Sequence, residues 1–97
     1  MEFIEIDSII HLEADGKYTR FHCEAGKPLF ISRNIKEYEA MFEEYSFFRI
    51  HRKHVINLNK IKKYHRGEGG YVVMSNGTSI DVSRRKKEEF LQRLGRR

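Results

Sequence analysis

Apolar and polar residues alternate over short stretches of the chain, with a period close to two. This period is typical of half-buried β-strands, whose successive side chains point to opposite faces of a sheet. In one such stretch Tyr18 and Arg20 fall on one face, and Thr19 and Phe21 fall on the other. The pattern predicts a mostly β fold with strands over residues 3–6, 9–13, 17–23, 29–33, 47–50, 55–58, 61–65, 71–74 and 78–82.

Turn-forming pairs separate several of these strands. Asp15-Gly16 predicts a tight hairpin of type I′, because both residues tolerate a positive φ, and Ala25-Gly26 and Asn76-Gly77 predict two more hairpins. A glycine-rich turn covers residues 67–70, but it lacks the Lys-Ser/Thr ending of a phosphate-binding Walker loop. We therefore expect antiparallel strands joined by tight turns, and no nucleotide site.

Two segments have apolar residues at helical spacing instead. Residues 35–45 repeat apolar side chains every three or four positions, and Asn34 stands where an N-cap is expected. The glutamates of this segment would face water, so we expect the helix to pack on the core and to take no part in nucleic-acid binding. A second short helix follows Ser83, its expected N-cap, and the end of the chain from Gly95 is expected to fray.

The length of 97 residues leaves room for a single domain with one modest core, spanning residues 1–97. The single cysteine, Cys23, excludes an internal disulfide and favours a reducing, cytoplasmic compartment. No apolar stretch approaches the roughly 20 residues of a membrane span, and the first residues lack the charged start of a signal peptide. We therefore expect a cytoplasmic chain without a membrane partner, which can be one module of a longer protein.

The charges are distributed unevenly along the chain. Residues 1–44 carry five basic and ten acidic side chains, whereas residues 45–97 carry fourteen basic and four acidic ones, within a net charge of +5. Residues 46–66 contain seven lysines and arginines, no acidic residue, and interleaved apolar residues. A disordered basic tail would lack those apolar residues, so the charges are expected on a folded surface. Such a surface should attract polyanions, with an ordinary solvated surface as the alternative.

Three basic groups lie at or near expected turns, where a β scaffold usually presents functional residues. The first follows the turn at residues 15–16, the second occupies residues 51–54, and the third, residues 84–87, begins the second helix. The third group opposes its helix dipole, so a bound phosphate or a merely solubilising surface would explain it. An arginine fork can bond two acceptors of guanine, whereas lysine more often meets phosphate as a point charge. We therefore expect Arg20, Arg52 and Arg84 to read bases, and Lys17, Lys53, Arg85 and Lys86 to bind phosphates.

The histidines near these groups do not match a metal or catalytic motif. There is no Cys-x-x-Cys or His-Glu-x-x-His spacing, and His22 and Cys23 are expected on opposite faces of one strand. We therefore expect no metal, no cofactor and no catalytic residue. One enzymatic alternative stays open, a small basic ribonuclease that uses His51 and His54 as acid and base, with Lys53 stabilising the transition state.

The stretch from residue 47 to residue 61 reads FFRIHRKHVINLNKI and resembles the signature of LytTR-type DNA-binding domains. That signature has the form Phe-x-Arg-x-His-[Arg/Lys]-Ser-x-[Ile/Val]-[Ile/Val]-Asn, followed shortly by Ile. Two flanking stretches are similar to the family's first strand and turn and to its Ile-Pro-[Val/Ile]-Ser-Arg end; they read IIHLEADGKYT at residues 9–19 and TSIDVSRR at residues 78–85. The resemblance covers nearly the whole chain.

The resemblance implies an elongated arrangement of small antiparallel sheets with two short helices. It also implies use at the C-terminus of bacterial two-component response regulators, although no receiver domain is present in this chain. In the family, loops that enter successive major grooves contact the bases. The matching positions here are Lys17, Thr19 and Arg20 in the first loop, His51 and Arg52 in the second, and Arg84 and Arg85 in the third.

Some residues depart from the family pattern, and two others allow a structural interpretation. Lys53 and His54 replace a common Ser and an aromatic or aliphatic residue, and Asp81 stands where Pro is frequent, which bears on the target sequence. Asn57 belongs to the signature but can equally bond backbone at a turn. Arg49, also in the signature, can brace the sheet or touch phosphate.

Together these observations predict a sequence-specific duplex-DNA-binding domain of a bacterial transcription regulator, bound to direct-repeat sites as a pair of protomers. Two other binding roles stay open. The acidic helix can bind a basic protein partner, or single-stranded RNA can stack on aromatic side chains of the sheets. The aromatic residues in question are Tyr18, Phe21, Tyr64 and Tyr71.

Overall fold

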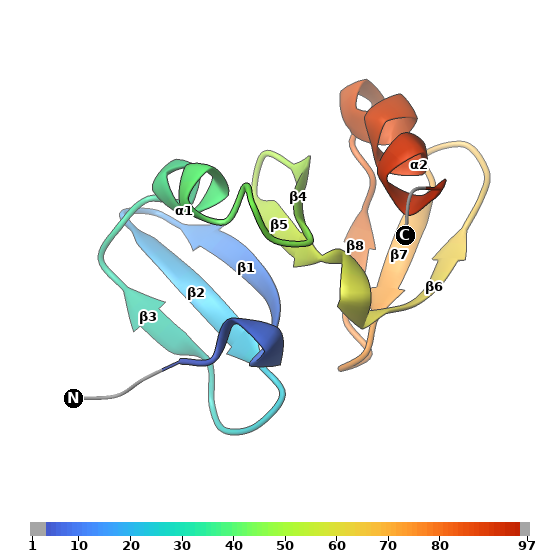
Figure 1. Cartoon of the computed structure of the whole chain (residues 1–97). Helices are drawn as coiled ribbons and strands as arrows, with labels where there is room; N and C mark the ends of the chain where they lie inside the picture. Colours follow the sequence, from blue (N-terminus) through green and yellow to red (C-terminus); the bar gives the residue numbers. More distant parts are fainter. Residues whose placement is uncertain (1–3, 96–97) are drawn as a thin grey trace.

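The computed structural model describes residues 4–95, which form an elongated molecule with extents of 42 × 23 × 23 Å (Figure 1). Within these residues, two α-helices and three short 3₁₀ helices accompany eight strands. The strands are β1 (Ile9–Asp15), β2 (Tyr18–Cys23), β3 (Leu29–Ile31), β4 (Phe47–His51), β5 (His54–Asn57), β6 (Ile61–His65), β7 (Tyr71–Met74) and β8 (Ser79–Asp81). The helices are α1 (Ile35–Met41), α2 (Lys87–Gly95), η1 (Ile6–Ser8), η2 (Leu58–Lys60) and η3 (Arg84–Lys86).

All the strand pairs are antiparallel, and they form two sheets. The first sheet has five strands in the order β3-β2-β1-β5-β4, and the second has three in the order β6-β7-β8. β4 and β5 lie in the middle of the molecule, between β1 and the second sheet (Figure 1). The expected mostly β fold, with small antiparallel sheets and two short helices, is confirmed.

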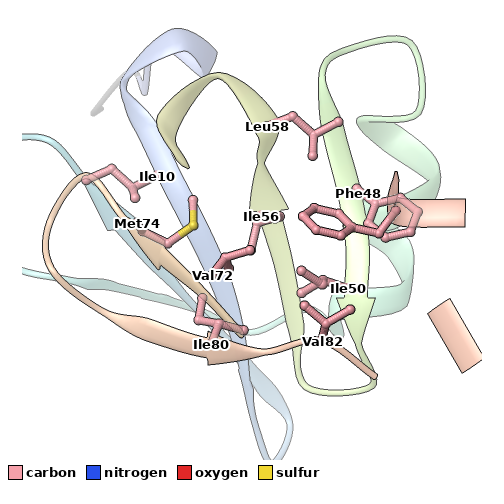
Figure 2. Packing of buried hydrophobic residues seen from close by; sticks show 10 residues of the cluster. Ile10, Phe48, Ile50, Ile56, Leu58, Val72, Met74, Ile80 and Val82 are labelled. Carbon is pink, nitrogen blue, oxygen red and sulfur yellow. The ribbon is translucent and has the colours of Figure 1, made fainter. Parts of the chain in front are cut away.

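The buried apolar residues form two clusters in place of the single core expected from the length. In one cluster, Leu12 and Phe21 of the five-stranded sheet pack with Tyr38 of α1. In the other, side chains of both sheets meet, such as Ile56 from β5 and Val72 from β7 (Figure 2), and Phe90 of α2 is buried with them. The five-stranded sheet therefore holds the two halves of the molecule together, because both clusters use its strands.

The two helix caps behave differently. Asn34 caps α1 as expected, because its Oδ1 accepts from the Glu37 N–H at 3.1 Å while the Glu37 carboxylate accepts from the Asn34 N–H at 3.3 Å. The cap expected at Ser83 was wrong, because the Ser83 side chain makes no capping hydrogen bond. The Ser83 backbone N–H instead donates to the Ile50 carbonyl at 3.0 Å, and η3 comes between Ser83 and α2.

Three further expectations need correction. No strand forms over Ile4 to Ile6, because Ile6 begins η1, and Phe3 lies outside the described residues, as do Arg96 and Arg97, where fraying was expected. The first helix ends at Met41 and not at residue 45. The hairpin after β1 is not of type I′: Asp15 pairs with Tyr18, and of the two loop residues only Gly16 has a positive φ, of 60°. A positive φ at the first loop residue is the arrangement of a type II′ turn.

Candidate nucleic-acid interface

The first and second basic groups meet at one end of the five-stranded sheet. β1 and β5 are antiparallel neighbours, with Glu13 opposite His54, so the turn after β1 lies beside the turn between β4 and β5. The Ala14 N–H donates to the Lys53 carbonyl at 2.8 Å and joins these two turns. Lys17 and Lys53 are therefore exposed on neighbouring turns of the same sheet end.

The third basic group is joined to the second through the Ser83–Ile50 backbone hydrogen bond. A groove of about 400 Å³ lies between the β4–β5 turn and η3. Its lining has four cations and one carboxylate, so it favours an anionic ligand. The residues that line it are Glu39, Arg49, His51, Arg52, Ser83, Arg85 and Lys86.

The fold thus brings the three groups onto one surface. The turns after β1 and after β4 and the start of the C-terminal helical segment all lie along the upper side of the molecule in Figure 1. We call this surface, made of residues 16–17, 51–53 and 84–86, the basic edge. It crosses from the five-stranded sheet to η3, which follows the three-stranded sheet.

Arg49 lines the groove but is mostly buried, and its side chain supports the basic edge from behind. Its Nε donates to the His51 carbonyl at 3.0 Å, its Nη2 donates to the Arg52 carbonyl, and its Nη1 donates to Glu39 Oε1 at 2.8 Å. The Arg49 side chain is only 17% exposed. Of the two roles that the sequence allowed, this arrangement supports a brace that ties the β4–β5 turn to α1.

Asn57 is also a scaffold residue. It is 3% exposed, its Nδ2 donates to the Ile9 carbonyl at 2.8 Å, and its Oδ1 accepts from the Asn59 N–H at 3.0 Å. Because both the Nδ2 and the Oδ1 atoms of this buried side-chain amide are hydrogen-bonded, Asn57 fixes β1 against the start of η2. Its place in the family signature therefore has a structural reason.

Two residues of the first loop are not available as free contacts in this structure. Arg20 pairs with Asp15 at 2.7 Å and with Glu13 at 3.4 Å, and its guanidinium lies over the Phe30 ring. Thr19 has no exposed surface. By contrast, the remaining predicted residues are accessible: Lys17, Arg52, Lys53, Arg84 and Arg85 are exposed, and His51 and Lys86 are partly exposed.

The histidine pair of the ribonuclease alternative has an environment that does not suit acid–base chemistry. The His51 and His54 ring centroids are 5.8 Å apart, and Nδ1 of His54 is buried without a hydrogen-bond partner among the described residues. Burial lowers the pKa of His54, and the neighbouring His51, His22 and Lys53 lower it further against the opposing effect of Glu13. His51 Nδ1 accepts from the Lys53 N–H at 3.2 Å, so that histidine helps to shape the turn.

The aromatic side chains of the RNA alternative do not form a common platform. Phe21 is 3% exposed and packs edge-on against Tyr38 in the core. Tyr64 is partly buried against Phe90, in the other half of the molecule. Tyr18 and Tyr71 are exposed, but they lie in different sheets. Within residues 4–95, no three His, Cys, Asp or Glu side chains gather in a way that would hold a metal ion.

One cation at this end of the sheet was missed by sequence reasoning. Arg33 lies two residues after the end of β3 and is exposed. The antiparallel order of the first three strands places the end of β3 beside the start of β2, so the expected hairpins alone were enough to find it.

The family model of the LytTr DNA-binding domain matches residues 1–95. This chain belongs to that family. The structure is similar to the LytTr DNA-binding domain of a putative methyl-accepting/DNA response regulator from Bacillus cereus, with a TM-score of 0.84 and 26% sequence identity. The similarity covers 95% of this chain and 85% of that one. The fold and the resemblance expected from the sequence are thereby confirmed.

A curated relative is the CO-responsive transcriptional regulator RcoM of Rhodospirillum rubrum, which is 34% identical over 77 residues. The matched stretch covers 78% of this chain but only 32% of that regulator. This chain therefore corresponds to about a third of the relative's length. In the described part of the chain, no helix is long and apolar enough to cross a membrane.

Proposed function

We propose that this LytTr domain reads specific sequences in duplex DNA for a bacterial transcription regulator, and that the basic edge is its contact surface. The observation that carries the proposal is the groove in which the β4–β5 turn and η3 present Arg52, Arg85 and Lys86 together. The meeting of two separate basic stretches in one groove supports a binding surface over a merely solubilising one. The domain itself catalyses no reaction, and its place of action is the cytoplasm.

The size of the molecule supports contact with successive major grooves. Equivalent points on a duplex repeat every 34–36 Å or so, and the longest dimension of the domain is 42 Å. In this arrangement the three turns of the basic edge are distributed over the two grooves, with Arg52 facing base edges and Lys53 facing the neighbouring phosphates. We further propose that two protomers bind direct-repeat sites, because one domain covers little more than one turn of DNA.

The experiment that tests this proposal is selection from a pool of randomised duplexes by the purified domain, at 50 and 200 mM salt, followed by sequencing. We expect enrichment of a short motif, repeated about one helical turn apart, at both salt concentrations. Retention of DNA without any enriched motif would reject sequence-specific reading and leave only electrostatic binding. Preferential capture of single-stranded RNA in a competition assay would reject duplex DNA as the ligand.

The double variant Arg52→Ala, Arg85→Ala tests the role of the basic edge in this selection, and a variant at Lys62 and Lys63 is its matched control. Both changes lie in the groove and leave the buried clusters intact, so the domain should fold normally. If the basic edge is the contact surface, this variant loses the enriched motif. A variant with the same charge change at Lys62 and Lys63, exposed on β6 away from the groove, should keep it.

A further inference from the structure

The connection between β3 and α1 brings Arg33 to the end of the sheet that carries the basic edge. Ile31 of β3 is opposite Thr19 of β2, so the residues after Ile31 lie beside the turn that contains Lys17. β3 is the outermost strand of its sheet, two strands beyond β1. Because neighbouring strands are about 4.8 Å apart, Arg33 extends the row of basic turns by roughly 5 Å beyond β2, the strand that Lys17 directly precedes.

The backbone of Arg33 is held on both sides. Its N–H donates to the Ile31 carbonyl at 2.8 Å, and its carbonyl accepts from Thr19 Oγ1 at 2.7 Å. Thr19 is 0% exposed, so its hydroxyl is fully committed to this hydrogen bond. The next residue, Asn34, is fixed by its capping bond with Glu37. The base of the Arg33 side chain is therefore well ordered, although the residue is exposed.

The charge of Arg33 is not compensated within the described part of the protein. Arg20, the arginine expected to act in this loop, is paired with two carboxylates. Among the ion pairs formed by residues 4–95, none involves Arg33 or Lys17. Its guanidinium also has no hydrogen bond there to fix the orientation of its fork. An unpaired guanidinium whose orientation is not fixed suits a phosphate better than a base edge. Hydrogen bonds to a base edge require the guanidinium to point in a defined direction.

We propose that Arg33 binds a backbone phosphate of duplex DNA and that Thr19 is the residue that positions it. This inference rests on the proposed duplex binding and widens the interface to the outermost strand. It also assigns Thr19 a role that is compatible with its burial, because the Thr19 hydroxyl donates a hydrogen bond to the Arg33 carbonyl from inside the sheet. The contact between Arg33 and phosphate should increase the affinity for every DNA sequence equally, so it does not discriminate between sequences.

The test measures the affinity of Arg33→Ala for the selected duplex and for an unrelated duplex, by fluorescence anisotropy between 50 and 200 mM salt. Loss of one phosphate contact should reduce the slope of log K against log salt by about 0.9, which makes the loss about threefold greater at 50 mM than at 200 mM. We expect the same loss on both duplexes. The control is Lys27→Ala, an exposed cation in the turn between β2 and β3 at the opposite end of the sheet, which should bind as the wild type does.

Thr19→Val removes the hydroxyl and keeps the side-chain shape, so it should weaken binding as Arg33→Ala does. The double variant should be no weaker than Arg33→Ala alone, and Thr19→Ser should restore binding. Unchanged affinity of Arg33→Ala would overturn the contact, and a loss confined to the selected duplex would overturn its assignment to phosphate. Full additivity in the double variant would overturn the role of Thr19. If the wild type bound no duplex at all, the proposed function itself would fail.

Discussion

Arginine side chains near the basic edge have distinct tasks that depend on what surrounds each of them. Arg49 directs its donors to two carbonyls and Glu39, whereas Arg20 is neutralised by Glu13 and Asp15. Arg52 is exposed, and its own carbonyl is fixed by Arg49. An exposed guanidinium on a braced turn has the rigidity that base reading requires.

We therefore predict different effects for neighbouring residues of the β4–β5 turn. Arg52→Ala should cost about 1–3 kcal/mol on the selected duplex and relax specificity at one position, because a bidentate base contact is lost. Lys53→Ala should weaken binding to all duplexes by a similar factor, because a phosphate contact is lost. Competition with a panel of singly substituted duplexes measures both effects. Uniform losses for both variants would show that Arg52 reads no base.

His11 is a buried polar residue whose environment opposes protonation. It is 1% exposed, its ring stacks on His22 with 4.1 Å between centroids, and neither ring nitrogen has a hydrogen-bond partner among the described residues. Burial, together with the smaller effects of nearby His22 and His54, lowers the pKa of His11 from 6.5 to about 3. The folded protein therefore keeps this ring neutral at a pH where the unfolded chain would protonate it.

This difference predicts that stability falls in mild acid. The contribution of neutral His11 is complete above pH 6.5, the pKa of the unfolded chain, and is lost progressively as the pH falls towards about 3. Between pH 7.5 and 5.5, where most carboxylates stay ionised, His11 should account for about 1 kcal/mol of the decrease in unfolding free energy. Urea unfolding of the wild type and of His11→Phe at the two pH values measures this contribution. An equally steep decrease in both proteins would contradict it.

At the scale of elements, the β4–β5 turn is positioned from three sides. β1 bonds it through Ala14 and Lys53, the segment before η3 bonds β4 through Ser83 and Ile50, and Arg49 links it to α1. α1 therefore contributes to the interface, and its residue Glu39 lines the groove. Its acidic outer residue Glu39 supplies the carboxylate that orients Arg49.

We predict that Arg49→Lys weakens DNA binding although it preserves the charge. A lysine cannot bond two carbonyls and a carboxylate with a planar fork, so the turn should lose its fixed shape. Affinity for the selected duplex should fall, on the order of tenfold, with the salt slope unchanged because no phosphate contact is removed. Titrations at several salt concentrations separate the two quantities. A slope reduced by about one would show instead that Arg49 itself contacts phosphate.

At the scale of the whole molecule, the two ends of the sequence differ strongly in charge. Residues 1–44 carry ten acidic side chains, but several of these neutralise cations inside the fold, as Glu13 does for Arg20 and Glu39 does for Arg49. The basic edge keeps its exposed lysines and arginines, so the folded molecule presents a positive surface. Such a surface attracts DNA at long range before any specific contact forms.

The expected consequence is a steep salt dependence. If about six to ten phosphates are neutralised in the complex with the pair of protomers, the affinity should fall by about 10³–10⁵ between 50 and 200 mM salt. Anisotropy titrations with the selected duplex over this range give the number of released counterions from the slope. A slope that corresponds to one or two phosphates would mean that most of the basic edge lies away from the DNA.

The sequence by itself determined most of the strands, the two α-helices and the family. Alternation of apolar residues, the pairs Asp15-Gly16 and Asn76-Gly77, and the cap at Asn34 are local signals, and local signals are sufficient for strands, hairpins and the first helix. The stretch at residues 47–61 also identified the LytTr family, which the family model confirms. The three basic groups were found in the same way, because clusters of basic residues beside expected turns can be recognised from the amino-acid sequence alone.

Only the tertiary structure decided which residues of those groups are free to bind. The alternation of apolar and polar residues placed Thr19 and Arg20 on opposite faces of a strand. It did not show that Thr19 is fully buried or that Arg20 forms ion pairs with two carboxylates. The Ser83–Ile50 bond, the brace at Arg49 and the position of Arg33 depend on strands that pair across long separations in sequence. Burial and ion pairing are properties of what lies across the fold from a residue, and the order of residues along the chain does not contain that information directly.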